Sequence, residues 1–119
     1  MSERREAAER RGRRAEAVCV LLLRLKGYRI VARRLRSRVG EIDILARQGG
    51  TLVAIEVKAR DTLDGAAFSV TERQQVRIAR AAALAQAQFP RFASAPVRFD
   101  VMLVAPRRWP VHLRNAFST

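Results

Sequence analysis

Two short apolar stretches that carry charges decide how this chain folds: Gly40-Glu41-Ile42-Asp43-Ile44-Leu45 and Ile55-Glu56-Val57-Lys58. The segment between them contains Gly49-Gly50, and a Gly-Gly pair between two apolar runs predicts a two-residue β-hairpin turn. If the strands fold back about that turn, Asp43 lies opposite Glu56, and Glu41 lies opposite Lys58. The stretches therefore predict a hairpin with two acids set side by side within it.

Side chains alternate between the two faces of such a hairpin. Asp43, Glu56 and Lys58 share one face, where Glu41 is an expected ion-pair partner of Lys58. Because like charges directly opposed in a sheet destabilise it, this arrangement indicates a cation bound between the two acids. The opposite face carries the apolar residues that we expect to supply a core: Ile42, Ile44, Val53, Ile55 and Val57.

The length and charge of the chain limit its class. Its 119 residues, 49% of them hydrophobic, are enough for one core, so we expect a single domain over residues 1–119. The net charge is +13 and the isoelectric point is about 11.8. Such a charge favours an anionic partner, because neutralising phosphates releases counterions. We expect that partner to be nucleic acid, with DNA favoured over RNA; a basic structural or ribosome-associated protein is an alternative.

The counts of two residue types exclude several kinds of site. Cys19 is the single cysteine and His112 the single histidine, which excludes disulfides within the chain, thiolate zinc sites and histidine-cluster metal sites. The apolar run at residues 17–23 is too short to span a membrane and is followed by Arg24 and Lys26. We therefore expect a cytoplasmic protein with no membrane contact.

The remaining patterns predict the order helix, three strands, helix, strand, which is an α/β sandwich with a mixed sheet. An amphipathic helix is expected from about Gly12 to Lys26, after a frayed lead-in over residues 1–11. Thr71 and Gln74 form a capping-box pattern that opens a second helix. The loop from Asp61 to Ser69 is a candidate for closing over a substrate. The expected strands cover residues 28–36, the hairpin 39–60, residues 97–105 and a short last strand at 111–114.

The two acids of the hairpin suit a hard divalent cation, Mg²⁺ or Mn²⁺, which takes oxygen ligands. Asp43 and Glu56 are the candidate metal ligands, and the backbone carbonyl of Val57 is a third. Such an ion promotes phosphodiester hydrolysis by polarising the phosphoryl oxygen and activating water. Lys58, on the same face, is a candidate for orienting that water or offsetting charge on the phosphorane. The pattern therefore predicts a metal-dependent nuclease.

Two further residues are candidates for the site, each with an alternative. Glu16 belongs to an otherwise apolar helical row with Val20 and Leu23, so we expect its carboxylate to point toward the sheet. It is a fourth candidate catalytic residue, as a further metal ligand; the alternative is a surface acid paired with a nearby arginine. Gln74 is a candidate for contacting the site or phosphates, and capping is its alternative role.

Basic residues beside the hairpin are candidates for binding nucleic acid. Four arginines enter the hairpin next to the acids, one follows Lys58, and two lie at helical spacing on the second helix. Trp109 is a candidate for stacking on a base, and packing over the sheet edge is the alternative. The candidate nucleic-acid-binding residues are Arg33, Arg34, Arg36, Arg38, Arg60, Arg73, Gln74 and Arg77.

The candidate site resembles the PD-(D/E)XK nuclease superfamily, whose pattern is a helix Glu, a strand Asp, and Glu-x-Lys on the next strand. The matching positions are Glu16, Asp43, Glu56 and Lys58. More closely, the chain resembles the small bacterial YraN family, which is akin to archaeal Holliday-junction resolvases. This resemblance rests on Gly40-Glu41-Ile42-Asp43 with Glu56-Val57-Lys58-x-Arg60, and on weaker matches at Gly12-x-x-Ala15-Glu16, Gly27-Tyr28, Arg98-Phe99-Asp100-Val101 and Asn115-Ala116-Phe117.

The resemblance implies a restriction endonuclease-like fold with a three-layer, helix-β-β-β-helix-β core. It also implies endonuclease activity on DNA, branched DNA included, and a homodimer. The chain departs from the YraN pattern at Arg34-Leu35, where the family tends to carry Asn-Trp, and at Gln74, where it often carries lysine. The alternative function is a non-catalytic nucleic-acid-binding module of the same fold.

Overall fold

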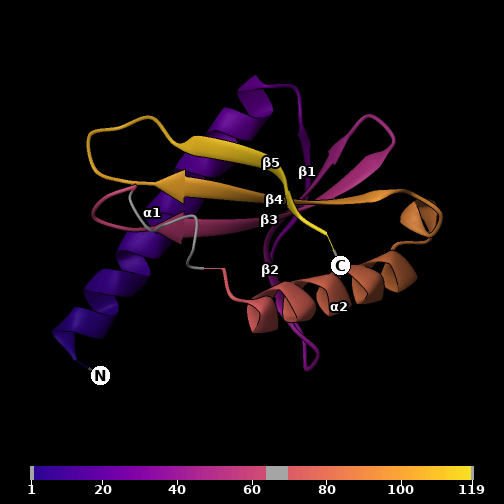
Figure 1. Cartoon of the computed structure of the whole chain (residues 1–119), viewed down its shortest axis with the longest axis horizontal. Helices are drawn as coiled ribbons and strands as arrows, with labels where there is room; N and C mark the ends of the chain where they lie inside the picture. The colour runs from indigo at the N-terminus through magenta and orange to yellow at the C-terminus, as the bar shows by residue number, and fades with distance from the viewer. Residues whose placement is uncertain (1, 64–69, 119) are drawn as a thin grey trace.

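The centre of the fold is a hairpin of two strands, β2 (Glu41–Gln48) and β3 (Thr51–Ala59). In the computed structural model, which describes residues 2–63 and 70–118, these strands join through a tight turn at Gly49-Gly50 (Figure 1). The first glycine has a φ of 59°, a left-handed conformation that glycine adopts without steric cost. Ile44 pairs with Ile55, which is the register predicted from the sequence.

Three further strands complete one five-stranded sheet in the order β1-β2-β3-β4-β5. β1 (Arg29–Arg36) pairs antiparallel with β2, and β4 (Val97–Val104) pairs parallel with β3. β5 (Val111–Phe117) pairs antiparallel with β4. The predicted antiparallel meander and the predicted mixed sheet are therefore confirmed, and the last strand is longer than expected.

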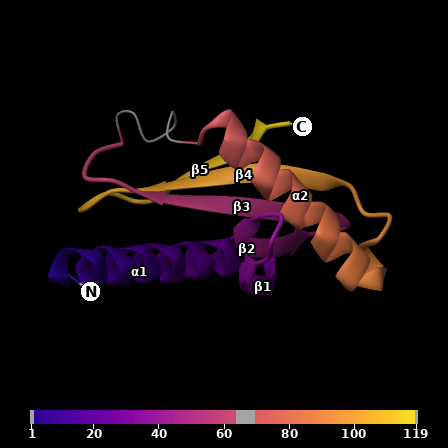
Figure 2. The same cartoon turned by 90° about the horizontal axis from the view of Figure 1, so that it is seen from below.

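The helix α1 (Glu3–Leu25) covers one face of the sheet (Figure 2). It begins at Glu3 rather than near Gly12, because Ser2 caps it by accepting a hydrogen bond from the backbone N–H of Arg5. The turns up to Arg14 are exposed on all sides and extend beyond the strands (Figure 1). The core on this face consists of Cys19, Val20, Leu23, Tyr28, Ile44, Ala46, Val53, Ile55 and Met102.

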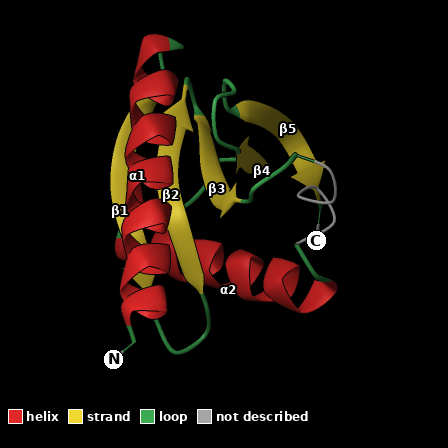
Figure 3. Ribbon diagram, turned by 90° about the vertical axis from the view of Figure 1, so that its left-hand side faces the viewer, coloured by secondary structure: helices red, strands yellow, loops and turns green. Residues whose placement is uncertain are grey.

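The helix α2 (Glu72–Gln88) covers the opposite face and so completes three layers (Figure 3). Thr71 and Gln74 form the capping box predicted from the sequence. A short 3₁₀ turn, η2 (Pro90–Phe92), leads from this helix toward β4. The core on this face consists of Ile42, Leu45, Leu52, Ala54, Ile78, Ala81, Ala82, Ala85, Phe92 and Phe99.

One prediction about the core is wrong. Ile42 was expected beside Ile44 in one core, but it packs on the α2 side while Ile44 packs on the α1 side. The pairing of β2 with β3 ends at Ile44 and Ile55. Beyond that pair the strands no longer follow one ladder, so simple alternation does not predict where Ile42 points.

Two remaining expectations concern the membrane and the loop after β3. No helix in the described parts of the chain is long and apolar enough to cross a membrane. Residues 64–69, which make up most of the loop from Asp61 to Ser69 expected to close over a substrate, lie outside the described residues.

Candidate active site

Asp43 lies where β2 and β3 stop pairing. The last backbone pair is Ile44 with Ile55, and one residue further the carboxylate of Asp43 accepts a 2.8 Å hydrogen bond from the backbone N–H of Val57. The Val57 N–H therefore donates to the Asp43 side chain rather than to a backbone carbonyl of β2. The Asp43 carboxyl group is also within hydrogen-bonding reach of Glu56, as the hairpin register predicts.

Burial disfavours ionisation of both acids, and the charge of Asp43 adds to this effect at Glu56. Burial, followed by the charge of Asp43, raises the pKa of Glu56 to about 8. Burial also raises the pKa of Asp43, against the opposing effects of hydrogen bonds from Val57 and Glu56. At neutral pH these effects favour the protonated form of Glu56. Binding a divalent cation would relieve the repulsion that keeps this proton in place.

Lys58 supplies a buried ammonium group beside the acids. Its Nζ lies 3.6 Å from Oε1 of Glu56, and the residue is only 8% exposed. The expected pairing of Lys58 with Glu41 is wrong, since Glu41 pairs with Arg36 at 3.9 Å. Glu41 and Lys58 both lie beyond the end of the β2–β3 pairing, where the register no longer fixes which side chains meet.

Glu16 faces the sheet from α1, as predicted, and is 6% exposed. Its carboxylate accepts hydrogen bonds from Nε of Arg33 at 3.1 Å and from Nε of Arg34 at 3.2 Å. Its charge also raises the pKa of Asp43. Within the described residues, no three His, Cys, Asp or Glu side chains gather to hold a metal ion. Glu16 is thus paired with arginines as in the alternative, but it is buried rather than a surface acid, and its role as a metal ligand stays a prediction.

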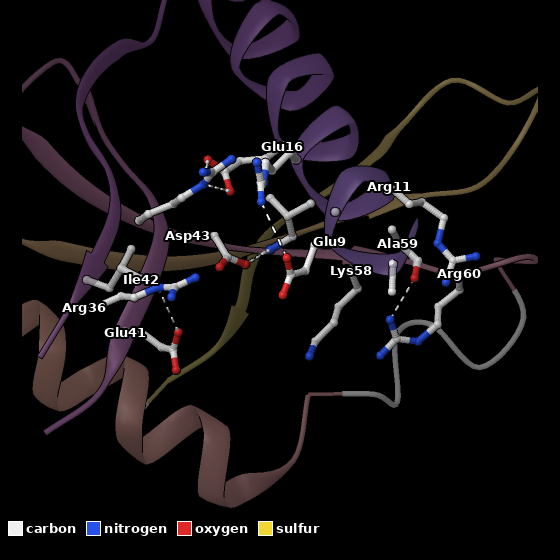
Figure 4. A pocket seen from close by; sticks show the side chains of 15 residues that line it. Glu9, Arg11, Glu16, Arg36, Glu41, Ile42, Asp43, Lys58, Ala59 and Arg60 are labelled. Atoms are coloured by element: carbon white, nitrogen blue, oxygen red, sulfur yellow. Dashed lines mark hydrogen bonds and ion pairs between the residues drawn. The ribbon is translucent and has the colours of Figure 1, made fainter. Parts of the chain in front are cut away.

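A cavity of about 740 Å³ opens on Asp43 between α1 and the strands β1, β2 and β3 (Figure 4). Asp43, Val57 and Lys58 all line it. Its wall carries more cationic than anionic side chains. The anionic residues that line it are Glu9, Glu16, Glu41 and Asp43. The cationic residues that line it are Arg11, Arg13, Arg34, Arg36, Lys58 and Arg60.

A smaller hollow of about 260 Å³ reaches the same acids from the α2 side. Asp43, Glu56, Gln74 and Arg77 line it. The side chain of Gln74 accepts a hydrogen bond from the backbone N–H of Thr71 at 3.0 Å, so its capping role is confirmed. The capping side chain thus also borders the acids.

The structure brings only some of the predicted nucleic-acid-binding arginines to the acids. Arg34, Arg36 and Arg60 line the larger cavity. Arg38 and Arg73 are exposed and line neither cavity. The first three therefore border the same space as Asp43, the other two do not, and the binding role of all five stays a prediction.

The sequence reasoning missed the contribution of the first turns of α1. Ala8, Glu9 and Arg11 line the larger cavity, whereas the residues before Gly12 were expected to be a frayed lead-in. Ser2 at the cap position, followed by good helix formers such as Ala, Glu and Arg, was the signal that could have revealed them. The alternative role of Trp109 is also wrong, since it is 83% exposed and does not pack over the sheet edge.

Comparisons with known proteins place the chain in one family. A family model described as "Uncharacterised protein family UPF0102" matches residues 15–104. A UPF0102 protein from Parvibaculum lavamentivorans is 55% identical over 93% of this chain and 84% of its own length. Another from Methylorubrum extorquens is 50% identical over 97% of this chain and 90% of its own length. This chain therefore belongs to the UPF0102 family, which confirms its kinship with the YraN proteins.

Proposed function

We propose that this chain is a divalent-metal-dependent nuclease of the PD-(D/E)XK type that hydrolyses phosphodiester bonds in DNA. The observation that carries the proposal is the cluster of Asp43, Glu56 and Lys58: Asp43 and Lys58 line a cavity with a mainly basic wall, and Asp43 and Glu56 line a smaller hollow on the α2 side. Arginines suit a polyanionic substrate. Two buried acids at the same place would repel that substrate unless a cation lay between them and it.

The donor set fits Mg²⁺ or Mn²⁺. Asp43 and Glu56 offer adjacent carboxylates, and hard divalent cations prefer oxygen ligands. Burial raises the pKa of both acids in spite of the lowering effect of the Lys58 charge, so a bound divalent cation would favour their ionised forms. In this proposal Asp43, Glu56 and the backbone carbonyl of Val57 hold the ion, which would supply Lewis acidity for the phosphoryl oxygen and lower the pKa of the attacking water.

The side chains around the acids have separate roles in the proposed reaction. The Val57 N–H holds the Asp43 carboxylate in one orientation. Lys58 donates a hydrogen bond to the reacting phosphate and offsets its growing negative charge, which is the kind of electrostatic stabilisation that dominates phosphoryl chemistry. Arg34, Arg36 and Arg60, which line the cavity, bind flanking phosphates and fix the position of the scissile bond.

A cleavage assay tests the proposal. The purified protein is incubated with duplex, single-stranded and four-way-junction DNA and with duplex RNA, in Mg²⁺, Mn²⁺ or EDTA. We expect metal-dependent cleavage of DNA that falls by about a hundredfold or more in Asp43→Asn and Lys58→Met. Glu41→Gln is the matched control, since it removes a neighbouring charge that is paired with Arg36. Absence of cleavage of every substrate with either metal would refute the nuclease proposal.

One observation favours a non-catalytic nucleic-acid-binding module as the second candidate. Glu16, the third carboxylate in the nuclease pattern, is engaged by Arg33 and Arg34. In a pure binder, acids that face phosphates would only weaken binding, because they repel the phosphates. For such a module, Asp43→Asn would strengthen binding to DNA in EDTA, and neither the wild type nor any variant would cleave DNA.

A further inference from the structure

Gly12 is a residue that the fold itself does not explain. It lies in the interior of α1 and is not among the residues with positive φ. A Cβ atom added there would meet nothing within 4 Å. Glycine in a helix interior is less stable than alanine, because the unfolded chain gains entropy. None of the described residues therefore requires glycine at this position.

Gly12 lines the larger cavity, which Asp43 also lines. Ala8, Gly12 and Glu16 are spaced four residues apart, so they form one row along α1. All three line the cavity together with Asp43 and Lys58. Glu16 at one end of the row is buried against the sheet, so the row leads along the cavity wall toward the sheet. Its two small residues leave the backbone of α1 open to a ligand that reaches the acids.

Arginines flank this open backbone. Arg11 and Arg13 both line the cavity, and each has one exposed ion-pair partner. Nη1 of Arg11 lies 3.4 Å from Oδ1 of Asp61, and Nη2 of Arg13 lies 3.6 Å from Oε2 of Glu9. Exposed ion pairs contribute little to stability, so these guanidinium groups can exchange their present partners for phosphates at small cost.

We propose that α1 forms one wall of the substrate channel, where the sugar–phosphate backbone of a double-stranded nucleic acid runs against Gly12. Arg11 and Arg13 then contact phosphates on either side of the glycine. None of the described residues that line the cavity is aromatic, so this part of the wall offers no platform on which unpaired bases could stack. Recognition through backbone charge without stacking favours a duplex. This inference rests on the proposed function, because it extends the same site.

The first test measures how bulk at Gly12 affects binding. A short fluorescein-labelled DNA duplex is titrated in EDTA, and binding is followed by fluorescence anisotropy. Gly12→Gln is expected to weaken binding by about tenfold or more while raising Tm by a few degrees, because glutamine is the better helix former. Ala7→Gln is the matched control: Ala7 is exposed on the same helix and does not line the cavity. Unchanged binding by Gly12→Gln, or an equal loss in Ala7→Gln, would overturn the proposal.

The second test measures phosphate contacts through salt dependence. The double variant Arg11→Gln/Arg13→Gln is expected to reduce the slope of log K against log salt by about 2, about 1 for each contact. Arg10→Gln/Arg14→Gln makes the same change in charge at positions that do not line the cavity, and we expect a smaller reduction. Equal slopes for the two double variants would count against specific contacts.

The same measurements separate this inference from the proposed function. If the wild type cleaves DNA and Gly12→Gln binds and cleaves as the wild type does, the α1 wall is refuted and the nuclease stands. If nothing is cleaved but Gly12→Gln selectively loses duplex binding, the nuclease is refuted and the wall stands. Single strands bound as tightly as the duplex would overturn the assignment to double-stranded nucleic acid.

Discussion

The carboxylate of Asp43 accepts the backbone N–H of Val57 at 2.8 Å, just past the last pair of the β2–β3 ladder. A buried backbone donor without a partner would be costly, so this bond allows the two strands to separate without leaving the donor unsatisfied. It also orients Asp43 toward Glu56. The separation of the strands and the adjacency of the acids thus depend on one side chain.

Replacing Glu56 by glutamine is expected to stabilise the metal-free protein. Burial and the charge of Asp43 raise the pKa of Glu56 to about 8, above a value of about 4.3 for an unfolded glutamate. Because the folded state holds the proton more tightly, the wild type loses stability as pH rises from about 4 to about 8. Glu56→Gln removes that loss. In EDTA, its Tm should exceed the wild-type Tm by several degrees at pH 8 and by less at pH 5.

Glu41→Gln is the control for this prediction, since the Glu41 side chain is 57% exposed and pairs only loosely with Arg36. Its Tm should follow the wild-type pH dependence. Adding Mg²⁺ or Mn²⁺ should raise the Tm of the wild type, because ligand binding stabilises the state that binds, and should raise that of Glu56→Gln less. A Glu56→Gln Tm below that of the wild type at pH 8 in EDTA would contradict the placement of this acid.

The parts of the fold that follow from local pattern could be predicted from the sequence. The hairpin register depends on Gly49-Gly50 and on strict alternation, and the start of α2 depends on Thr71 and Gln74. Both signals lie within a few residues of the feature they specify. The mixed sheet follows as well, since a helical crossover between strands brings β4 back parallel to β3.

Features that depend on distant contacts could not be predicted in this way. Glu41 was paired with Lys58 by extending the hairpin register, but the register ends before either residue. The contacts of Glu16 depend on how β1 crosses beneath α1 and brings Arg33 and Arg34 to it. Sequence spacing gives no distance between elements, so the sequence identified the acids of the site but not the neighbours of each.

Asp100 is expected to hold β5 against β4. It is fully buried, and it accepts hydrogen bonds from Nε of Arg98 at 2.8 Å and from the backbone N–H of Asn115 at 2.9 Å. His112 Nε2 lies 2.7 Å from the same carboxylate. Asp100→Asn should lower the free energy of unfolding by about 3 kcal/mol or more, because it leaves these donors without a charged acceptor. Urea denaturation at pH 7 measures this loss.

The effect of Asp100→Asn should depend on pH. Burial alone would raise the pKa of Asp100, but hydrogen bonds from His112, Arg98 and the Asn115 N–H hold it well below its usual range. Its contribution is therefore complete above about pH 4 and is lost as pH falls toward the folded-state pKa. The difference between wild type and variant should shrink below pH 4. Asp61→Asn, which alters an exposed acid, should show little effect at any pH.

Gly40 is expected to tolerate no side chain, because α2 approaches its backbone closely. A Cβ atom at Gly40 would overlap the backbone carbonyl of Arg77, so Gly40→Ala must displace the helix. Overpacking of this kind should lower the free energy of unfolding by about 2 kcal/mol or more. Gly50→Ala is the control, since its Cβ would meet nothing within 4 Å. Equal stability of the two variants in urea would show that α2 does not lie against Gly40.

Cys19 should be unreactive while the protein is folded. Burial, followed by the charges of Asp43 and Glu16, raises the pKa of its thiol to about 12, and the thiolate is the form that attacks disulfide reagents. At pH 8 the native protein should therefore release almost no thionitrobenzoate from Ellman's reagent over minutes. Since the chain has one cysteine, full reaction in urea should release one equivalent. Rapid labelling of the native state would mean that α1 leaves the sheet readily, and the cavity beside Asp43 would then lack its fixed wall.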